Sequence, residues 1–186
     1  MPKVEDSIRI ENVVASATLN QKIDLKAVVK GNPGVEYRPE TFPGLVFRLK
    51  RPKTAILIFS TGKMVCTGAK SEKEANRAVR KVVKELKKSG IIIPGKPEIK
   101  VVNMVASASL SGRIELEQSA YSLGKTMYEP EQFPGLIYRM DEPKVVILLF
   151  ASGKLVCTGA TKEEDVHKAV TKLHEKLEEE DLIYYE

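Results

Sequence analysis

Hydrophobic and polar residues alternate along residues 10–19, and this alternation predicts a β-strand. One face of the strand carries Asn12 and Val14, and the opposite face carries Val13. The pattern returns at residues 101–110, and each position of the first copy has its counterpart 91 positions later in the second. Because no insertion or deletion interrupts this register, the sequence predicts two similar halves related by a pseudo-twofold axis.

The rest of each copy predicts a short helix, an antiparallel meander of three strands and a long helix. In the first copy, residues 60–62 are typical of a tight hairpin within the meander. The long helix is expected to begin with a capping box formed by Ser71 with Glu74. Thr161 with Glu164 is expected to repeat this box in the second copy. The predicted ranges in the first copy are 21–30 for the short helix and 44–50, 53–59 and 63–69 for the strands.

These elements divide the chain into two repeats joined by a short linker. The linker contains Pro94 and Gly95, which separate the first long helix from the second copy. The chain ends in an acidic run at 178–181, which is expected either to repel non-specific DNA and competing chains or simply to fray. The predicted boundaries are 1–93 for the first repeat, 94–99 for the linker, 100–177 for the second repeat and 178–186 for the acidic C-terminal tail.

Both faces of the predicted strands are hydrophobic, although the helices of each copy suffice to cover only one face of its sheet. Ile56 and Ile58 lie on one face of their strand, while Leu57 lies on the other. Strict alternation in the next strand adds Thr67 and Ala69 to this second face. The second face either packs against the other half of the chain in a sandwich or stays exposed for a partner.

Composition and charge narrow the class of function. A net charge of +5 and a pI of about 9.1 suit a polyanionic partner without requiring one. The sequence shows no nucleophile paired with a base, no carboxylate pair and no phosphate-binding glycine loop, so we expect no enzyme and no catalytic residue. No apolar run is long enough to span a bilayer, and residues 1–6 lack the apolar core of a signal peptide. We therefore expect a soluble, intracellular protein without a membrane partner.

The few cysteines and histidines predict neither a disulfide nor a metal site, and we expect no cofactor. Cys66 and Cys157 occupy equivalent positions, one in each copy, and are expected to be small buried side chains. His167 and His174 lie seven positions apart on a predicted helix, without a cysteine or a paired carboxylate at ligand spacing. They are expected to be exposed surface residues.

Three motifs carry a resemblance to a known family. Residues 133–140 read Phe-Pro-Gly-Leu-Ile-Tyr-Arg-Met, and residues 58–70 contain a glycine–lysine–x–valine–cysteine–threonine–glycine hairpin that occurs again in the second copy. Both copies also open with a reduced form of a Gln-x-Asn motif, Glu11-Asn12 and Val102-Asn103. Over about residues 8–175, the chain resembles the TATA-box-binding protein family, the general transcription factors of archaea and eukaryotes, and its acidic tail is similar to the archaeal form.

The resemblance implies an α+β fold, in which two pseudo-symmetric repeats form a saddle-shaped, curved antiparallel sheet with helices on the convex face. It implies a general initiation factor that binds the minor groove of A/T-rich TATA-box promoter DNA and kinks it with inserted phenylalanines, a mode of bending for which this family is the standard example. The implied location is the chromosome, in the cytoplasm of an archaeal cell. Implied partners are double-stranded promoter DNA, transcription factor B and, indirectly, RNA polymerase, with a homodimer as a possible DNA-free state.

The resemblance also implies a role for each position that matches the family's motifs. Two pairs of rings are expected to enter base steps: Phe42 with Phe59, and Phe133 with Phe150. Contacts to base edges are expected from Asn12, Asn103, Thr67, Thr158, Val14, Val105, Val65, Val156, Leu57 and Leu148. Phosphate contacts are expected from Arg48, Arg139, Lys63 and Lys154.

Factor B, by the same resemblance, contacts the second copy just before Phe133, at Glu129, Glu131 and Gln132. The first copy carries Arg38, Glu40 and Thr41 at the equivalent positions. We expect this difference in charge to select the second half for the partner. A different class of function stays open from the residues alone: a helix-grip module that holds a small apolar ligand, or a dimerisation module that does not bind DNA.

Overall fold

The computed structural model describes residues 3–186, so the first two residues of the predicted first repeat lie outside the described part. The chain forms two compact units. One unit comprises Asn12–Val102, and the other comprises the residues up to Glu11 together with Asn103–Glu186. Each unit therefore contains most of one repeat.

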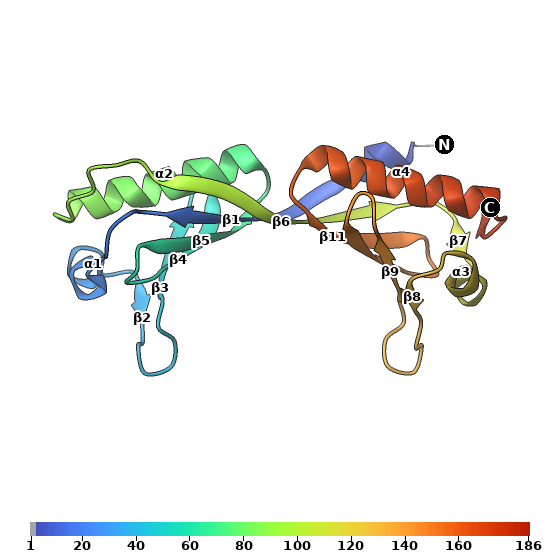
Figure 1. The fold of residues 1–186 in the computed structure, drawn as a ribbon, viewed down its shortest axis with the longest axis horizontal. Helices are drawn as coiled ribbons and strands as arrows, with labels where there is room; N and C mark the ends of the chain where they lie inside the picture. Colours follow the sequence, from blue (N-terminus) through green and yellow to red (C-terminus); the bar gives the residue numbers. More distant parts are fainter. Residues whose placement is uncertain (1–2) are drawn as a thin grey trace. The chain divides into compact units, whose positions relative to one another are not determined.

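The unit Asn12–Val102 contains an antiparallel sheet and two helices (Figure 1). Its elements are β1 (Arg9–Thr18), α1 (Leu25–Gly31), β2 (Glu36–Tyr37), β3 (Leu45–Lys50), β4 (Lys53–Ile58), β5 (Lys63–Ala69) and α2 (Glu72–Lys88). The strands lie in the order β2-β3-β4-β5-β1. Helix α2 packs against β4 and β5, on one side of the sheet, while the loop between β2 and β3 projects on the side away from α2.

The second unit repeats this plan and adds short elements at both ends. Its elements are η1 (Val4–Ser7), β6 (Glu98–Ser109), β7 (Arg113–Ile114), α3 (Leu116–Ser122), β8 (Thr126–Met127), β9 (Leu136–Met140), β10 (Val145–Leu149), β11 (Lys154–Ala160), α4 (Glu163–Glu179) and β12 (Ile183–Tyr184). The main sheet has the order β6-β11-β10-β9-β8, and β7 pairs with β12 in a second, two-stranded sheet. Helix α4 packs against β11 and against η1.

Burial in both units follows the predicted alternation. In β1 the residues Val13, Ala15 and Ala17 are buried, while the residues between them stay partly exposed. In α2 the apolar stripe is buried, including Ala78 and Val82, because it packs against the inner face of the sheet. The α+β fold with two pseudo-symmetric repeats is confirmed, and each sheet has its long helix on one face only.

One alternation was predicted wrongly, at the end of β5. Ala69 is fully buried on the helix-covered face, whereas strict alternation placed it on the other face with Thr67. The reason is a β-bulge, marked by a register shift between β1 and β5 and by a φ of +97° at Gly68. Gly159 has a φ of +103° at the equivalent bulge of the second unit. Glycine suits both positions because left-handed backbone is open to it without steric cost.

The starts of the helices differ in part from the predictions. Ser71 Oγ accepts a hydrogen bond from the backbone N–H of Glu74 at 3.0 Å, which confirms this half of the first capping box. The second box was predicted wrongly, because the N-cap of α4 is Lys162, the true counterpart of Ser71, and no side chain among the described residues caps this helix. Helix α1 starts only after Asp24, whose side chain caps it, and is therefore shorter than predicted.

The end of the chain is docked and does not fray. Leu182 and Ile183 are buried in the core of their unit, and the Leu182 carbonyl accepts a hydrogen bond from the Glu115 N–H at 3.1 Å. His174, predicted to be an exposed residue, is only 21% exposed, because its Nε2 lies 2.6 Å from the hydroxyl of Tyr185. The apolar residues that follow the acidic run therefore anchor the end of the chain.

The start of the chain belongs to the unit of the second repeat. The hydroxyl of Ser7 donates to the carbonyl of Ser109 at 3.0 Å and accepts from the N–H of Ser109 at 2.9 Å. Ile10 packs against the core of the same unit. By contacts, the first part of β1 thus lies with the second repeat and the first part of β6 with the first repeat. The repeat and linker boundaries given above stay a prediction.

Candidate nucleic-acid interface

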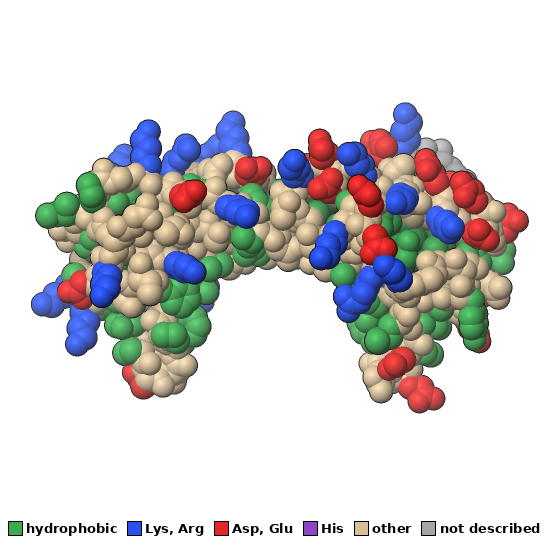
Figure 2. Space-filling view, viewed as in Figure 1, with side chains coloured by type: hydrophobic (Ala, Val, Ile, Leu, Met, Phe, Trp, Pro, Cys, Tyr) green, Lys and Arg blue, Asp and Glu red, His purple; other side chains and the backbone are tan. Residues whose placement is uncertain are grey.

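We call the sheet face that no long helix covers the open face of each unit. On it, cross-strand pairing places equivalent side chains in rows. Leu57 lies opposite Val65 in the first unit, and Leu148 lies opposite Val156 in the second. All the residues predicted to contact base edges are partly exposed, and buried strand neighbours of the valines and leucines among them, such as Val13 and Ile56, point the other way. Figure 2 shows hydrophobic side chains gathered on the side of each unit away from its long helix.

An asparagine and a threonine form the main polar group on each open face. Asn12 Oδ1 accepts the N–H of the bulge residue Gly68 at 2.7 Å, and Asn12 Nδ2 donates to Thr67 Oγ1 at 3.2 Å. Because the glycine N–H occupies Oδ1, the amide is oriented with its nitrogen toward the threonine. Nδ2 carries a second N–H, and the threonine hydroxyl can rotate to donate. The pair therefore offers hydrogen-bond donors to a ligand.

The second unit repeats this group with nearly the same geometry. Gly159 donates its N–H to Asn103 Oδ1 at 2.7 Å, and Asn103 Nδ2 lies 3.3 Å from Thr158 Oγ1. The bulges that upset the predicted alternation are thus the features that orient both amides. The sequence signal that could have revealed them is the glycine that follows threonine in both hairpins.

Two phenylalanines meet edge to face in each unit. The ring centroids of Phe42 and Phe59 are 5.9 Å apart, and those of Phe133 and Phe150 are 5.8 Å apart. Phe42 is 40% exposed, on the loop that projects before β3. Each predicted pair is therefore brought together by the fold, with ring surface open to solvent.

The glycine after each Phe-Pro makes room for the ring pair, a role that sequence reasoning missed. A Cβ added at Gly44 would lie 2.7 Å from Cε2 of Phe42 and 2.9 Å from Cε1 of Phe59. At Gly135 the corresponding distances to Phe133 and Phe150 are 2.8 Å and 3.0 Å. Any side chain here would displace the rings.

By the role that the resemblance implies for the rings, Gly44→Ala is expected to weaken binding to A/T-rich DNA about tenfold, because the displaced rings would lose the geometry needed to stack on bases while the fold is kept. The matched control is Gly34→Ala, where an added Cβ meets no described atom within 4 Å. Fluorescence anisotropy with a labelled duplex measures the affinity, and thermal unfolding checks the fold. Equal affinities of the two variants would show that the ring geometry does not matter for binding.

Basic side chains border each open face. Arg48 is exposed at the end of a row that starts at Thr67 and crosses Ala55, and its Nε lies 3.6 Å from the carboxylate of Glu36. Lys63 is exposed at the start of β5, with its side chain on the open face. The equivalent Arg139 and Lys154 are exposed at the same places in the second unit. All four predicted phosphate contacts thus lie on the rim of an apolar surface.

The loops before the two Phe-Pro-Gly motifs have the same backbone conformation but differ in charge. Phe133 donates its N–H to the carbonyl of Glu129 at 3.0 Å, and Phe42 donates to that of Arg38 at the same distance. Glu129, Glu131 and Gln132 are all exposed. The two loops therefore present different chemistry in the same conformation.

The cysteines lie in the cores and take no part in this surface. Burial raises the pKa of Cys157 to about 11, and burial together with the charge of Glu74 raises that of Cys66 to about 11. Both thiols are therefore protonated at neutral pH and poor nucleophiles. Cys66 and Cys157 are free, buried residues, as predicted.

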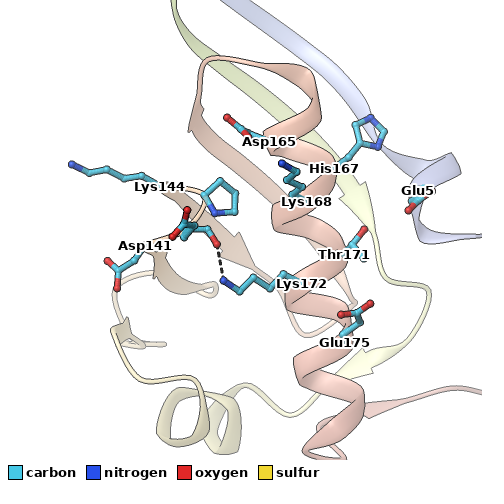
Figure 3. Close-up of a pocket in the computed structure, with 11 residues that line it drawn as sticks. Glu5, Asp141, Lys144, Asp165, His167, Lys168, Thr171, Lys172 and Glu175 are labelled. Carbon is cyan, nitrogen blue, oxygen red and sulfur yellow. Dashed lines mark hydrogen bonds between the residues drawn. The ribbon is translucent and has the colours of Figure 1, made fainter.

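Another hollow, beside α4, is lined by charges of both signs (Figure 3). Lys172 crosses it and donates to the carbonyl of Glu142 at 2.6 Å, so the lysine ties the helix to the β9–β10 turn.

In residues 3–186 no group of histidine, cysteine, aspartate or glutamate side chains is placed to hold a metal ion. None of the helices described is long and apolar enough to cross a membrane. Basic side chains outnumber acidic ones on α2, whereas α4 carries both signs (Figure 2).

Comparison with known proteins finds one family throughout. The chain matches the family described as "Transcription factor TFIID (or TATA-binding protein, TBP)" over residues 7–89 and 98–180. It is 55% identical to the TATA-box-binding protein of Sulfolobus acidocaldarius, over 95% of this chain and 89% of the relative. Identity to the protein of the same name from Methanothermobacter thermautotrophicus is 53%, over 95% and 97%. The solved structure of Methanococcus jannaschii TBP matches with a TM-score of 0.85 and 51% identity, over 93% of this chain and 99% of that chain.

Proposed function

Since the chain belongs to the TATA-binding protein family, a family of transcription factors and not of enzymes, we propose that it is a general initiation factor that binds the minor groove of A/T-rich promoter DNA. Its place is then on the chromosome of an archaeal cell. The observation that carries the proposal is the open face: an apolar surface whose central polar group, the oriented asparagine–threonine pair, occurs once in each unit.

The chemistry of the open face fits the minor groove of A·T pairs. There, A·T and T·A both present only acceptors, adenine N3 and thymine O2, which match the amide and hydroxyl donors. Guanine adds an amino group that would meet the valine and leucine side chains without a hydrogen-bond partner. Readout is therefore A·T against G·C, together with the ease of bending the DNA.

The phenylalanine pairs supply the wedges of this proposal. A ring that enters a base step replaces part of the stacking that the kink removes, and apolar wedges are the common device of minor-groove binders. The pairing of an exposed ring on a loop with a ring at the end of a strand supports this role, because the second ring holds the first in place. The four rim cations then contact phosphates and position the duplex.

Three short duplexes test the minor-groove proposal. The first has a TATA-type site, the second has inosine·C in place of its A·T pairs, and the third is the G·C version. Inosine·C keeps the minor groove of A·T but changes the major groove, so similar binding to the first two and loss on the third are expected. Binding to inosine·C that is no better than to G·C would contradict minor-groove readout. If no duplex binds, the open face belongs to a protein or a small apolar ligand.

The loop before Phe133 is the proposed contact for transcription factor B, through which RNA polymerase joins. Because this loop is acidic and the equivalent loop carries Arg38, factor B distinguishes the two repeats by charge. Glu129→Arg is expected to lower recruitment of factor B to the DNA complex by about tenfold, measured by a gel-shift titration. Arg38→Ala, the matched control in the first repeat, leaves recruitment as it is. Recruitment that survives Glu129→Arg would argue against this contact.

In the absence of DNA, we propose that the protein forms a dimer in which each copy covers the open faces of the other. The apolar rows of the open face supply the surface for such an association. Sedimentation with and without an A/T duplex tests it, since DNA should then dissociate the dimer.

A further inference from the structure

The residue before each asparagine also differs in chemistry between the two repeats. Position 11 is glutamate, and its counterpart at position 102 is valine. At every other position to which a contact with bases, phosphates or base steps was assigned, the two repeats carry the same residue type. The positions assigned to DNA contacts are therefore alike in the two repeats, whereas position 11 adds a negative charge that position 102 lacks.

The carboxylate of Glu11 lies on the open face of the unit that contains the second repeat. Ser107 Oγ donates to Glu11 Oε1 at 2.8 Å. Ser107 alternates with buried residues in β6 and lies opposite Val156, one of the predicted base-edge residues. The serine thus holds the carboxylate beside the surface that would meet the DNA.

The surroundings of Glu11 allow an anion to come close to DNA. Arg9 and Lys154 line the same surface hollow as Glu11 and Ser107, together with the wedge residue Phe150. Asp6 lines the hollow too, so the two cations balance the charge of two carboxylates and offset their repulsion from phosphates. In the first repeat, the counterpart Val102 is 44% exposed and offers only methyl groups.

A carboxylate only accepts hydrogen bonds, and in the minor groove the only base donor is the amino group of guanine. We propose that Glu11 is a specificity-determining residue, which accepts a hydrogen bond from guanine N2 and lets one G·C pair occupy the position that faces it. The equivalent position facing Val102 admits only A·T. This inference rests on the proposed function and adds a polarity to it.

The polarity follows from the difference between the repeats. On a palindromic A/T site both orientations of the protein are equivalent in sequence. One G·C pair at the sensitive position makes them unequal, since only one orientation places guanine against Glu11. The protein itself then selects a direction, before any partner binds.

A scan of paired sites provides the test. In a palindromic A/T duplex, G·C is introduced at one position or at both symmetric positions, moving outward from the centre. At the sensitive position a single G·C is expected to weaken binding less than about threefold, because the protein turns to place it against Glu11. Two symmetric G·C pairs are expected to weaken binding about tenfold more, because one of them always faces Val102.

Two variants with reciprocal changes complete the design. In Glu11→Val, the single G·C is expected to cost as much as a full mismatch, about tenfold relative to the all-A/T duplex. In Val102→Glu, the duplex with two G·C pairs is expected to be bound nearly as well as the duplex with one. Affinities are compared as ratios to the all-A/T duplex within each protein, so that general changes in binding cancel.

The outcomes separate this inference from the function on which it rests. If Glu11→Val changes the affinity for all duplexes by one common factor, the carboxylate acts only on phosphates and the inference is overturned. If wild-type protein binds single and double G·C duplexes with independent, additive losses at every position, it is overturned as well. If wild-type protein fails to bind the all-A/T duplex, the proposed function fails instead.

Discussion

Replacing Asn12 and Asn103 together by aspartate is expected to lower the affinity for an A/T duplex by roughly 100-fold or more, with little effect on the fold. Each aspartate can still accept the glycine N–H of its bulge, now at 2.7 Å from Oδ1 of the asparagine. The lost group is the amide donor, and the threonine hydroxyl turns to donate to the new carboxylate. Acceptors and negative charge then face acceptors in the groove.

The asparagine variants are measured by anisotropy at one stated salt concentration, because phosphate contacts make affinities depend on salt. Asn→Ala at both positions serves as a comparison, since it removes the donors without adding charge and should fall between wild type and the aspartate variant. An unchanged melting temperature shows that the bulges persist. Wild-type affinity in the aspartate variant would mean that these amides do not face the bases.

Replacing Phe59 and Phe150 by alanine is expected to lower the affinity by about 30-fold or more and to reduce the bend of the bound DNA. Stacking of an aromatic ring on a base contributes on the order of 1–3 kcal/mol, and two rings are removed. Both rings are only partly buried, so the fold should lose less stability than a fully buried phenylalanine would cost. Energy transfer between dyes at the ends of the duplex reports the bend.

Tyr121→Ala is the matched control for the phenylalanine variants. Tyr121 is an aromatic residue of α3 with 81% of its surface exposed, and it lies outside the strands of the open face. Its removal should change neither affinity nor bend. A Phe59→Ala, Phe150→Ala protein that still bends the duplex like wild type would contradict the role of these rings as wedges.

The strands and their buried faces could be predicted because burial on one face leaves a period of two in the sequence. The bulge at Gly68 escaped this reasoning, since an extra residue changes the parity of everything that follows it, and Ala69 moved to the buried face. The capping error at Thr161 had a different cause. The register of 91 positions points to Lys162 as the counterpart of Ser71, and the pattern of a capping box was matched one position too early.

The structure of both chain ends depends on contacts between residues far apart in the sequence, and for this reason it could not be predicted. The acidic run suggested a free tail, but Leu182 and Ile183 are buried in the core, and Ile183 pairs with Ile114 of β7, which is distant in sequence. Nothing local in the sequence marks that contact. For the same reason the hydrogen bonds between Ser7 and Ser109 could not be foreseen, although they decide to which unit the start of the chain belongs.

The residue types of the candidate site could be predicted, but the backbone features that hold its side chains in place could not. The resemblance of the two hairpins and Phe-Pro-Gly motifs implied the phenylalanines, asparagines and threonines, and the fold brings each of these groups together. The bulge N–H that orients each amide and the glycine that accommodates each ring pair depend on backbone geometry. Glycines in a single sequence do not say whether they serve a turn, a bulge or a close contact.

The exchange of strand starts between the units has a bearing on how such a chain could arise. Residues up to Glu11 lie with the second repeat, and the start of β6, up to Val102, lies with the first. In a chain of one repeat alone, the first residues of its first strand would have no sheet to pair with. Its sheet would in turn lack the segment that the other repeat supplies. An ancestor with a single repeat would thus complete its fold only by swapping these segments with a second copy. Duplication of such an ancestor's gene would join an obligate pair rather than two independent domains.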